Sequence, residues 1–220
     1  MYFIKTPKWL KILYRSYHWD IASDEKALYL TFDDGPHAVA TNFVLDELKK
    51  YNAKATFFCI GKNVVAEKAT YQRVLEEGHT VGNHTHNHFN GWKSDDREYI
   101  ANILDAAQFI DSDLFRPPYG RITRFQAKAI MNTHQYKTYG FKIIMWDVLS
   151  GDFDKKISSE ACLLNVIKNS TNGSIIVFHD SEKAFQHLSY SLPKVLHYFS
   201  EKGFRFKALN STLFDKKGPE

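Results

Sequence analysis

The sequence predicts an α/β fold built on a parallel sheet, and three features of its 220 residues indicate this class. Short apolar runs rich in β-branched and aromatic residues recur along the chain, as buried strands do. Between these runs, apolar residues recur at helical spacing. Runs such as residues 174–178 are apolar on both faces, which a parallel strand covered by helices requires. Seven successive βα units leave two architectures, an open doubly wound sheet or a closed barrel.

The elements are predicted in chain order from these patterns. The seven strands are residues 27–32, 55–60, 80–83, 114–116, 142–146, 174–178 and 204–207. The clearest helix carries Leu192, Val195, Leu196 and Phe199 on one face, and others are centred on residues 44–51 and 100–107. Glycines near the helix ends, such as Gly173 and Gly203, are typical of caps that lead into the next strand.

Composition excludes several classes of protein. The formal net charge of +4 is too small to indicate a nucleic acid as partner. Two cysteines, Cys59 and Cys162, are too few for a cysteine-based zinc site or a disulfide framework. No glycine-rich dinucleotide or phosphate-binding motif occurs, and no apolar run is long enough for a signal peptide or a membrane span. We therefore expect a cytoplasmic location, with association with the envelope left open.

Polar residues cluster directly after the predicted strands. The segments concerned are residues 31–36, 83–88, 116–120, 147–152 and 179–180. In parallel α/β folds the carboxyl ends of the strands converge, and the chemistry gathers there. Because a radial arrangement lets all five segments face one pocket, this pattern favours the barrel.

The histidine-rich segment predicts a metal site. His84 and His88 are four residues apart, so one turn presents both imidazoles to a single ion. A carboxylate from the pair Asp33 and Asp34 would complete a catalytic site with open coordination positions, and the other carboxylate would act as general base. Exposed histidines and a solvated Asp-Asp-Gly-Pro turn are the structural alternatives.

Two further charged pairs are predicted near this site. Arg116 offers the general base a cation that keeps it ionised. Asp152 is expected to hold His179 in one tautomer and to favour its protonated form. A core histidine and a loop cap are the corresponding structural alternatives.

These segments resemble the five ordered motifs of the polysaccharide deacetylases, the carbohydrate esterases of family 4. The motifs are TFDDGP at residues 31–36, HTHNH at 84–88, RPPYG at 116–120, WDVLSGD at 146–152 and VFHD at 177–180. The resemblance covers roughly residues 26–210. It implies a distorted (β/α)7 barrel, a divalent cation and hydrolysis of acetyl groups from carbohydrates.

The resemblance also implies roles for individual residues. It makes Asp34, His84 and His88 the metal ligands, with Asp33 as general base paired with Arg116. Thr85 would support the histidine turn through a hydrogen bond. The backbone N–H of Tyr119 would hold the oxyanion, and His179, tuned by Asp152, would be the general acid. The expected metal is Zn²⁺, with Co²⁺, Ni²⁺ or Mn²⁺ as alternatives.

The chain departs from the family's pattern in the fourth and fifth motifs. Leu149 and Phe153 replace an aspartate and a tryptophan, and Val177 replaces a leucine. These changes affect the wall that receives the acetyl methyl group. The predicted substrate-contacting residues are Trp92, Pro117, Tyr119, Phe153 and Val177, and Trp92 is expected to stack on a sugar or to pack on the surface.

The expected substrate is an acetylated oligo- or polysaccharide, with N-acetylglucosamine units preferred. The domain layout implied is an N-terminal segment, residues 1–25, packed on a catalytic domain, residues 26–212, with a flexible tail, residues 213–220. Three rival functions remain: a small-molecule amide hydrolase on the same barrel, an Fe(II) oxygenase that uses two histidines and one carboxylate, and a carbohydrate-binding protein with a degenerate site. The sequence makes no prediction of oligomeric state.

Overall fold

The structure, a computed structural model, describes residues 2–131 and 140–214. Its strands form one sheet in which every paired strand is parallel to its neighbour. The strands are β1 (Ala27–Asp33), β2 (Thr56–Cys59), β3 (Thr80–Asn83), β4 (Leu114–Phe115), β5 (Lys142–Ile143), β6 (Val148–Leu149), β7 (Ile175–His179) and β8 (Arg205–Phe206). The predicted α/β class is therefore confirmed.

The strand order is β5-β4-β3-β2-β1-β7-β6, and β8 pairs with the first residues of β1. This path begins at β5 and ends at β6, so among the described residues the barrel is open between these two strands. The short strand β6 was not predicted, because residues 148 and 149 are two apolar residues within a polar segment and carry no readable period. The predicted strand 142–146 is correspondingly shorter in the structure and ends at Ile143.

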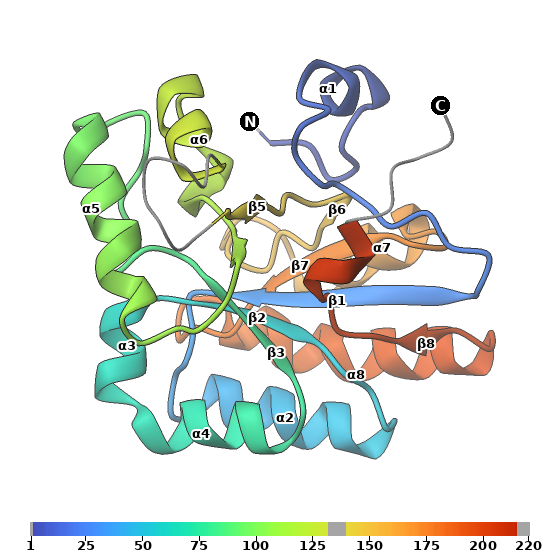
Figure 1. Cartoon of the computed structure of the whole chain (residues 1–220). Helices are drawn as coiled ribbons and strands as arrows, with labels where there is room; N and C mark the ends of the chain where they lie inside the picture. The colour runs from blue at the N-terminus through green and yellow to red at the C-terminus, as the bar shows by residue number, and fades with distance from the viewer. Residues whose placement is uncertain (1, 132–139, 215–220) are drawn as a thin grey trace.

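Helices cover the sheet, and Figure 1 shows α2, α4 and α8 together on one side of the strands. The helices are α1 (Lys8–Leu13), α2 (Ala40–Lys50), α3 (Gly61–Ala66), α4 (Lys68–Glu76), α5 (Asp96–Ala107), α6 (Arg124–Met131), α7 (Ser159–Asn169) and α8 (Phe185–Glu201), with short 3₁₀ turns η1 (Pro118–Gly120) and η2 (Ser211–Phe214). In the described residues, no helix is both long and apolar enough to span a membrane.

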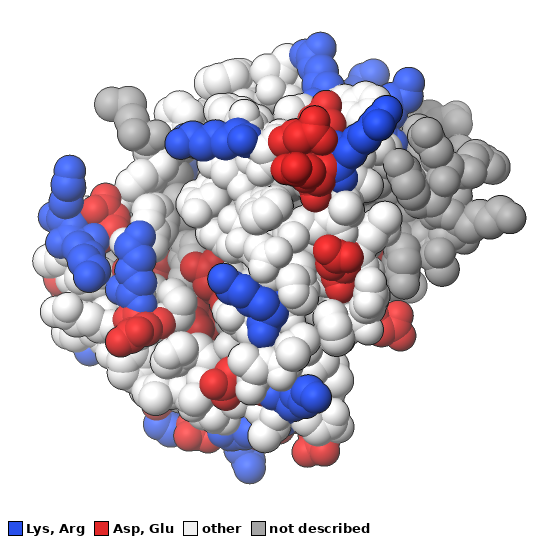
Figure 2. All heavy atoms as spheres, turned by 90° about the vertical axis from the view of Figure 1, so that its left-hand side faces the viewer, with Lys and Arg blue, Asp and Glu red and all other residues white. Residues whose placement is uncertain are grey.

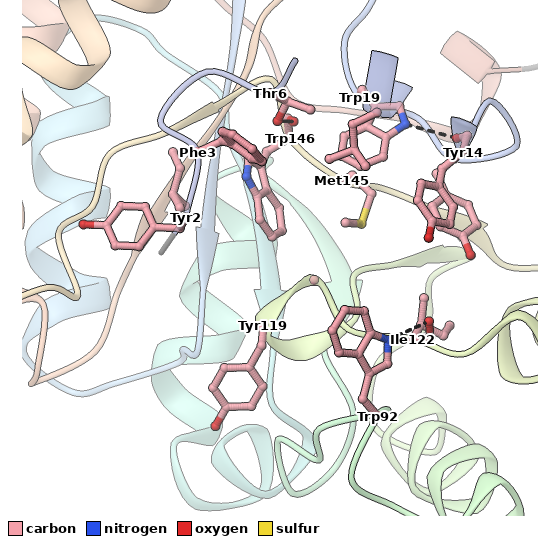
Figure 3. A pocket seen from close by; sticks show the side chains of 14 residues that line it. Tyr2, Phe3, Thr6, Tyr14, Trp19, Trp92, Tyr119, Ile122, Met145 and Trp146 are labelled. Atoms are coloured by element: carbon pink, nitrogen blue, oxygen red, sulfur yellow. Dashed lines mark hydrogen bonds between the residues drawn. The ribbon is translucent and has the colours of Figure 1, made fainter. Parts of the chain in front are cut away.

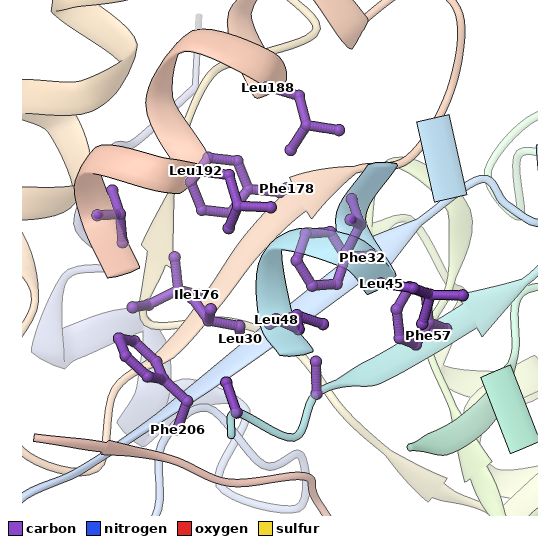
Figure 4. Packing of buried hydrophobic residues seen from close by; sticks show 14 of the residues in the cluster. Leu30, Phe32, Leu45, Leu48, Phe57, Ile176, Phe178, Leu188, Leu192 and Phe206 are labelled. Carbon is purple, nitrogen blue, oxygen red and sulfur yellow. The ribbon is translucent and has the colours of Figure 1, made fainter. Parts of the chain in front are cut away.

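The main core lies between the central strands and the helices α2 and α8 (Figure 4). Phe32 stacks between Phe57 and Phe178, with ring centroids 5.1 and 6.1 Å apart. Leucines of α2 and α8 cover this stack, and each large side chain buried in this way contributes roughly 1.5–3 kcal/mol. The packing holds β1, β2 and β7 in a register that places Asp33 opposite His179.

Residues 4–21 run across the gap between β5 and β6. Lys5 forms an isolated bridge with Val148, and His18 forms one with Ile144, which follows β5 directly. Asp147 anchors this segment from the barrel side, since its carboxylate contacts Nζ of Lys5 at 2.5 Å and Nζ of Lys11 at 2.6 Å. The N-terminal segment therefore covers the two ends of the open sheet.

Both cysteines, Cys59 and Cys162, are buried free thiols. Residues 213 and 214, which we predicted to begin a flexible tail, lie in η2 and pack against the cluster around Ile144. Residues 215–220 of that predicted tail lie outside the described residues.

Candidate metal and catalytic site

The predicted site residues meet where the strands end. They lie at the last residues of β1 and β7 or in the loops after β1, β3, β4 and β6. The parallel register brings Asp33 beside His179 and Asn83 beside Phe115. Figure 2 shows the side of the molecule that lies to the left in Figure 1, where β1 leads into α2. Acidic side chains lie in a hollow of this face, and acidic and basic groups are intermingled around it.

The three predicted metal ligands form one cluster. One ligand atom each from Asp34, His84 and His88 lies within 4.8 Å of the others. Nε2 of His88 is 3.1 Å from Oδ1 of Asp34, and Nε2 of His84 is 3.7 Å from the same oxygen. This buried oxygen accepts no well-aligned hydrogen bond from the described residues. Three electron-pair donors that converge on one point fit a divalent cation, and the two-His, one-carboxylate set is typical of catalytic sites with open positions.

Protonation states within the cluster also suit a cation. Burial lowers the pKa of His84 to about 4, so its imidazole is neutral at neutral pH. Burial raises the pKa of Asp34, but the contact with His88 and the charge of His179 outweigh this effect and hold it below its usual range. Nδ1 of His84 lies 2.7 Å from the carbonyl oxygen of Arg116. Because a carbonyl only accepts, Nδ1 carries the proton, and the lone pair on Nε2 points to the other ligands.

The backbone around this cluster is held in left-handed conformations. Five described non-glycine residues have positive φ, and four of them lie at the site: Asp34 (80°), Thr85 (64°), His88 (58°) and Tyr119 (61°). A non-glycine residue in this conformation costs about 1–2 kcal/mol, so the conformation persists only where the surrounding structure enforces it. Oγ1 of Thr85 accepts a hydrogen bond from the N–H of Phe89, which confirms the expected support of the histidine turn.

Asp33 forms a buried ion pair with Arg116. Nη1 of Arg116 donates to Oδ1 of Asp33 at 2.7 Å, and the two side chains are 0% and 5% exposed. The guanidinium also donates to the hydroxyl of Thr31 and to the carbonyl oxygen of Met145. The predicted pairing is therefore present, and it fixes the carboxylate next to the cluster.

His179 forms a second pair with Asp152. Its Nδ1 donates to Oδ1 of Asp152 at 2.7 Å, and its backbone N–H donates to Oδ2 at the same distance. Burial lowers the pKa of His179, but Asp152, together with the charges of Asp34 and Asp33, raises it to about 9. A protonated imidazole with Nδ1 engaged leaves the proton on Nε2 available to a substrate.

Comparison with known proteins gives the same family as the sequence motifs. The family model of polysaccharide deacetylases matches residues 20–139. The chain belongs to the polysaccharide deacetylase family. A peptidoglycan-N-acetylglucosamine deacetylase of Bacillus cereus is 34% identical over 201 residues, which cover 89% of this chain and 92% of that protein. Chitin deacetylase 2 of Saccharomyces cerevisiae is 32% identical over 81% of this chain and 58% of its own length.

Solved structures confirm the predicted distorted (β/α)7 barrel. The crystal structure of the Bc1960 peptidoglycan N-acetylglucosamine deacetylase superposes with a TM-score of 0.81 at 32% identity, covering 93% of this chain and 95% of that chain. A family 4 pseudoenzyme of Bacillus anthracis also shares the fold, with a TM-score of 0.74 at 20% identity over 89% of this chain and 68% of its own. The fold alone therefore does not establish activity, which depends on the residues of the site.

Several supporting residues of the site were not predicted. Oδ1 of Asn102, on α5, accepts hydrogen bonds from the N–H groups of His86 and Asn87. Nδ2 of Asn63, on α3, donates to the carbonyl oxygen of Asp34 at 2.7 Å. Single asparagines within helices carry no motif signal, so only their position in space identifies them.

Asp180 supports the loop after β1 through hydrogen bonds. Its Oδ1 accepts a hydrogen bond from the N–H of Gly35 at 3.1 Å, and Thr41 donates to its Oδ2 at 2.5 Å. A Cβ on Gly35 would lie 2.0 Å from Oδ2 of Asp180, so only glycine allows this approach. Burial and the charge of Asp34 raise the pKa of Asp180 to about 8, although the hydrogen bond from Thr41 opposes them.

The predicted substrate-contacting residues are divided between surface and interior. Trp92 and Tyr119 are 63% and 61% exposed, and the ring of Phe153 lies 5.2 Å from that of His179. Val177 is 1% exposed and Pro117 is buried, so both lie beneath the site surface in this structure.

Proposed function

We propose that this protein is a metal-dependent deacetylase that hydrolyses the N-acetyl groups of N-acetylglucosamine units in a glycan of the peptidoglycan type. The observation that carries the proposal is the proximity of two charged pairs, Arg116 with Asp33 and Asp152 with His179, to the cluster of Asp34, His84 and His88. Asp33 directly precedes Asp34 and lies opposite His179 in the sheet, so a base, an acid and a cation site are close together.

Asp34, His84 and His88 would hold the cation. When bound, a divalent cation such as Zn²⁺ polarises the acetyl carbonyl and lowers the pKa of a coordinated water toward ~7. The chain's own residues supply the remaining chemistry. Asp33, held in place by Arg116, accepts the proton of the attacking water.

The C–N bond then breaks with proton transfer from His179. Its Nε2 gives a proton to the leaving nitrogen, which departs as an amine, while the acetyl group leaves as acetate. The backbone N–H of Tyr119, whose left-handed conformation turns the loop after Pro118, is proposed to donate to the carbonyl oxygen as negative charge develops. The amide and water are thus converted to an amine and acetate, and no further reactant is required.

The substrate class rests on the relatives. Two proteins named peptidoglycan-N-acetylglucosamine deacetylase are 34% and 37% identical over 89% and 86% of this chain. We therefore place N-acetylglucosamine of peptidoglycan first. Chitin oligomers come second, because a chitin deacetylase is 32% identical over 81% of this chain.

Acetate release by the purified full chain tests the proposal. Peptidoglycan fragments, N-acetylchitooligosaccharides, acetylated xylan and small cyclic amides are each incubated with chelator-treated protein, with and without added Zn²⁺. We expect release from the first two substrates only after metal is restored. Release from the small amides alone would favour the rival amide hydrolase, and metal-dependent oxygen consumption would favour the oxygenase.

Substitutions of the neighbouring residues Asp33 and Asp34 distinguish the role of general base from that of metal ligand. Asp33→Asn is expected to keep zinc affinity and to lose about 10²–10⁴-fold in kcat, the usual contribution of a general base. Asp34→Asn is expected to weaken zinc binding by more than ~10-fold, measured by calorimetry. Asp105→Asn, an exposed carboxylate on α5, is the matched control. Wild-type turnover by Asp33→Asn would contradict the proposed mechanism.

A further inference from the structure

A cavity of about 260 Å³ lies beside the catalytic centre, and the N-terminal segment forms half of it. Seven of its fourteen lining residues come from residues 2–19, which precede the part of the chain matched by the family model. Figure 3 shows Tyr2, Phe3 and Tyr14 on one side, with Tyr119 and Trp92 opposite. Of the described residues that line the cavity, eight are aromatic and none has a charged side chain.

Aromatic contacts connect this cavity to both sides of the catalytic centre. Tyr119, part of the wall, lies with its ring 4.7 Å from that of the predicted ligand His88. Tyr2, also part of the wall, packs against Phe153 at 5.2 Å, and Phe153 packs against His179 at the same distance. A molecule that reaches His88 and His179 is therefore adjacent to the cavity.

The aromatic surfaces are held in place without a ligand. Trp92 is 63% exposed, yet its indole N–H donates to the carbonyl oxygen of Ile122 at 3.2 Å, and the Arg121 guanidinium lies 5.1 Å from its ring. The ring of Trp146 lies where a Cβ on Gly120 would meet it at 2.6 Å. An exposed tryptophan fixed by two contacts is pre-organised for binding, because little side-chain freedom is lost when a ligand arrives.

The N-terminal wall is likewise fixed to the barrel. The N–H of Leu149 donates to the carbonyl oxygen of Ile4 at 2.8 Å, and the hydroxyl of Thr6 donates to the carbonyl oxygen of Trp146 at 2.7 Å. Lys5 and Lys11 are tied to the buried carboxylate of Asp147. Phe3, 52% exposed, projects from this anchored stretch and lines the cavity.

We infer that residues 2–19 complete a sugar-binding subsite, in which this cavity holds the ring adjacent to the N-acetylglucosamine that reacts. This inference rests on the proposed function. A pyranose ring has an apolar face of C–H groups and an edge of hydroxyls, which suits aromatic walls with tyrosine hydroxyls among them. Because no charged side chain lines the cavity among the described residues, a charged peptide stem or a phosphate is disfavoured as occupant.

Dependence on chain length tests the inference. For the wild type, kcat/KM is expected to rise from the N-acetylglucosamine monomer to the tetramer. Phe3→Ser should lower kcat/KM for the tetramer by roughly tenfold, the effect of losing one aromatic contact, and change kcat/KM for the monomer less than about twofold. Trp92→Ala should also lower kcat/KM for the tetramer by roughly tenfold. Trp9→Ala, on the same segment, 58% exposed and not part of the cavity, is the matched control.

A binding measurement keeps this test independent of catalysis. Calorimetric titration of metal-free protein with the N-acetylchitotetraose oligomer should show weaker binding for Phe3→Ser than for the wild type and for Trp9→Ala. The subsite would be overturned if Phe3→Ser, Trp9→Ala and the wild type bound the oligomer equally, or if their kcat/KM depended equally on chain length. It would also be overturned if only an alkyl detergent displaced the bound sugar. If no glycan releases acetate under any condition, the proposed function fails, while the titration still reports on the cavity.

Discussion

Nη1 of Arg116 donates to Oδ1 of Asp33 at 2.7 Å in a place almost fully closed to water. The same guanidinium lies 4.1 Å from the ring of Phe58 and donates from Nε to the carbonyl oxygen of Ile144. Arg116 thus connects the end of β4 to the end of β1 across the barrel interior. Such a pair positions a carboxylate firmly, because an ion left without its partner in this environment is strongly destabilised.

Arg116→Lys is expected to lower both activity and stability. Lysine keeps the charge, but one ammonium cannot replace a planar fork that contacts Thr31, Asp33 and two carbonyl oxygens. We expect a loss of roughly 3 kcal/mol in the free energy of unfolding and a large fall in kcat. Urea denaturation and acetate release measure these effects, with the exposed Arg97→Lys as control. Unchanged kcat in a folded Arg116→Lys protein would contradict the positioning role.

The pH profile should depend on the pair of His179 and Asp152. The pKa of His179 is raised to about 9, so its proton remains available as the pH rises through neutrality, and activity falls as pH approaches that pKa. A cation neutralises part of the charge of Asp34, so the alkaline limb of the loaded enzyme should lie below 9. Asp152→Asn removes the partner charge and should move this limb to lower pH. Profiles of kcat/KM from about pH 5 to about 10 test this, with the exposed His197→Gln as control.

The same pair affects stability in a defined pH window. The folded pKa of His179 lies above its ordinary value of 6.5. Its contribution to the free energy of unfolding is therefore fully present below pH 6.5 and is lost as pH rises through about 9. Denaturation of metal-free protein should show this loss in the wild type and a smaller loss in Asp152→Asn. An equal pH dependence in both proteins would contradict the ion pair.

Substitutions of Asp180 should distinguish its hydrogen bonds from its charge. Because burial raises the pKa of this carboxyl to about 8, its neutral form predominates at pH 7 and asparagine resembles it closely. Asp180→Asn should retain zinc affinity within about tenfold, whereas Asp180→Ala leaves the N–H of Gly35 without its acceptor and should weaken zinc binding further. Calorimetric zinc titration of both variants decides between these outcomes. Equal affinities would indicate that Asp180 does not position the loop.

The anchor of the N-terminal segment should be measurable at Asp147. Burial raises the pKa of Asp147, but Lys11, Lys5 and Ser174 outweigh it and lower the net value below 3.8. The anchor therefore contributes stability above about pH 4 and loses it as pH falls further. Asp147→Asn should cost roughly 2 kcal/mol and speed hydrogen exchange in residues 4–21. Asp20→Asn, whose half-exposed carboxylate also pairs with Lys11, should cost less than about 1 kcal/mol.

The candidate site was predictable to the extent that its residues follow strands in short motifs. The ligand set, the pairing of Arg116 with Asp33 and that of Asp152 with His179 all carry local polar signals at the ends of apolar runs. Asn63 and Asn102 carry no such signal, since each supports the site from a helix distant in sequence. The strand β6 escaped prediction because two apolar residues are too few to establish a period.

Local sequence patterns predict the α/β class, the positions of most strands along the chain and the chemistry that follows them, because burial on both faces and helical spacing are local properties. The residue pattern left open which of the two carboxylates converges with His84 and His88, and the family resemblance assigned Asp34. The tertiary structure brings Asp34 to the two histidines and Asp33 to Arg116. It also brought residues 2–19 to the open side of the barrel, next to Tyr119. These choices depend on strand register and on contacts between distant segments, which no local pattern encodes.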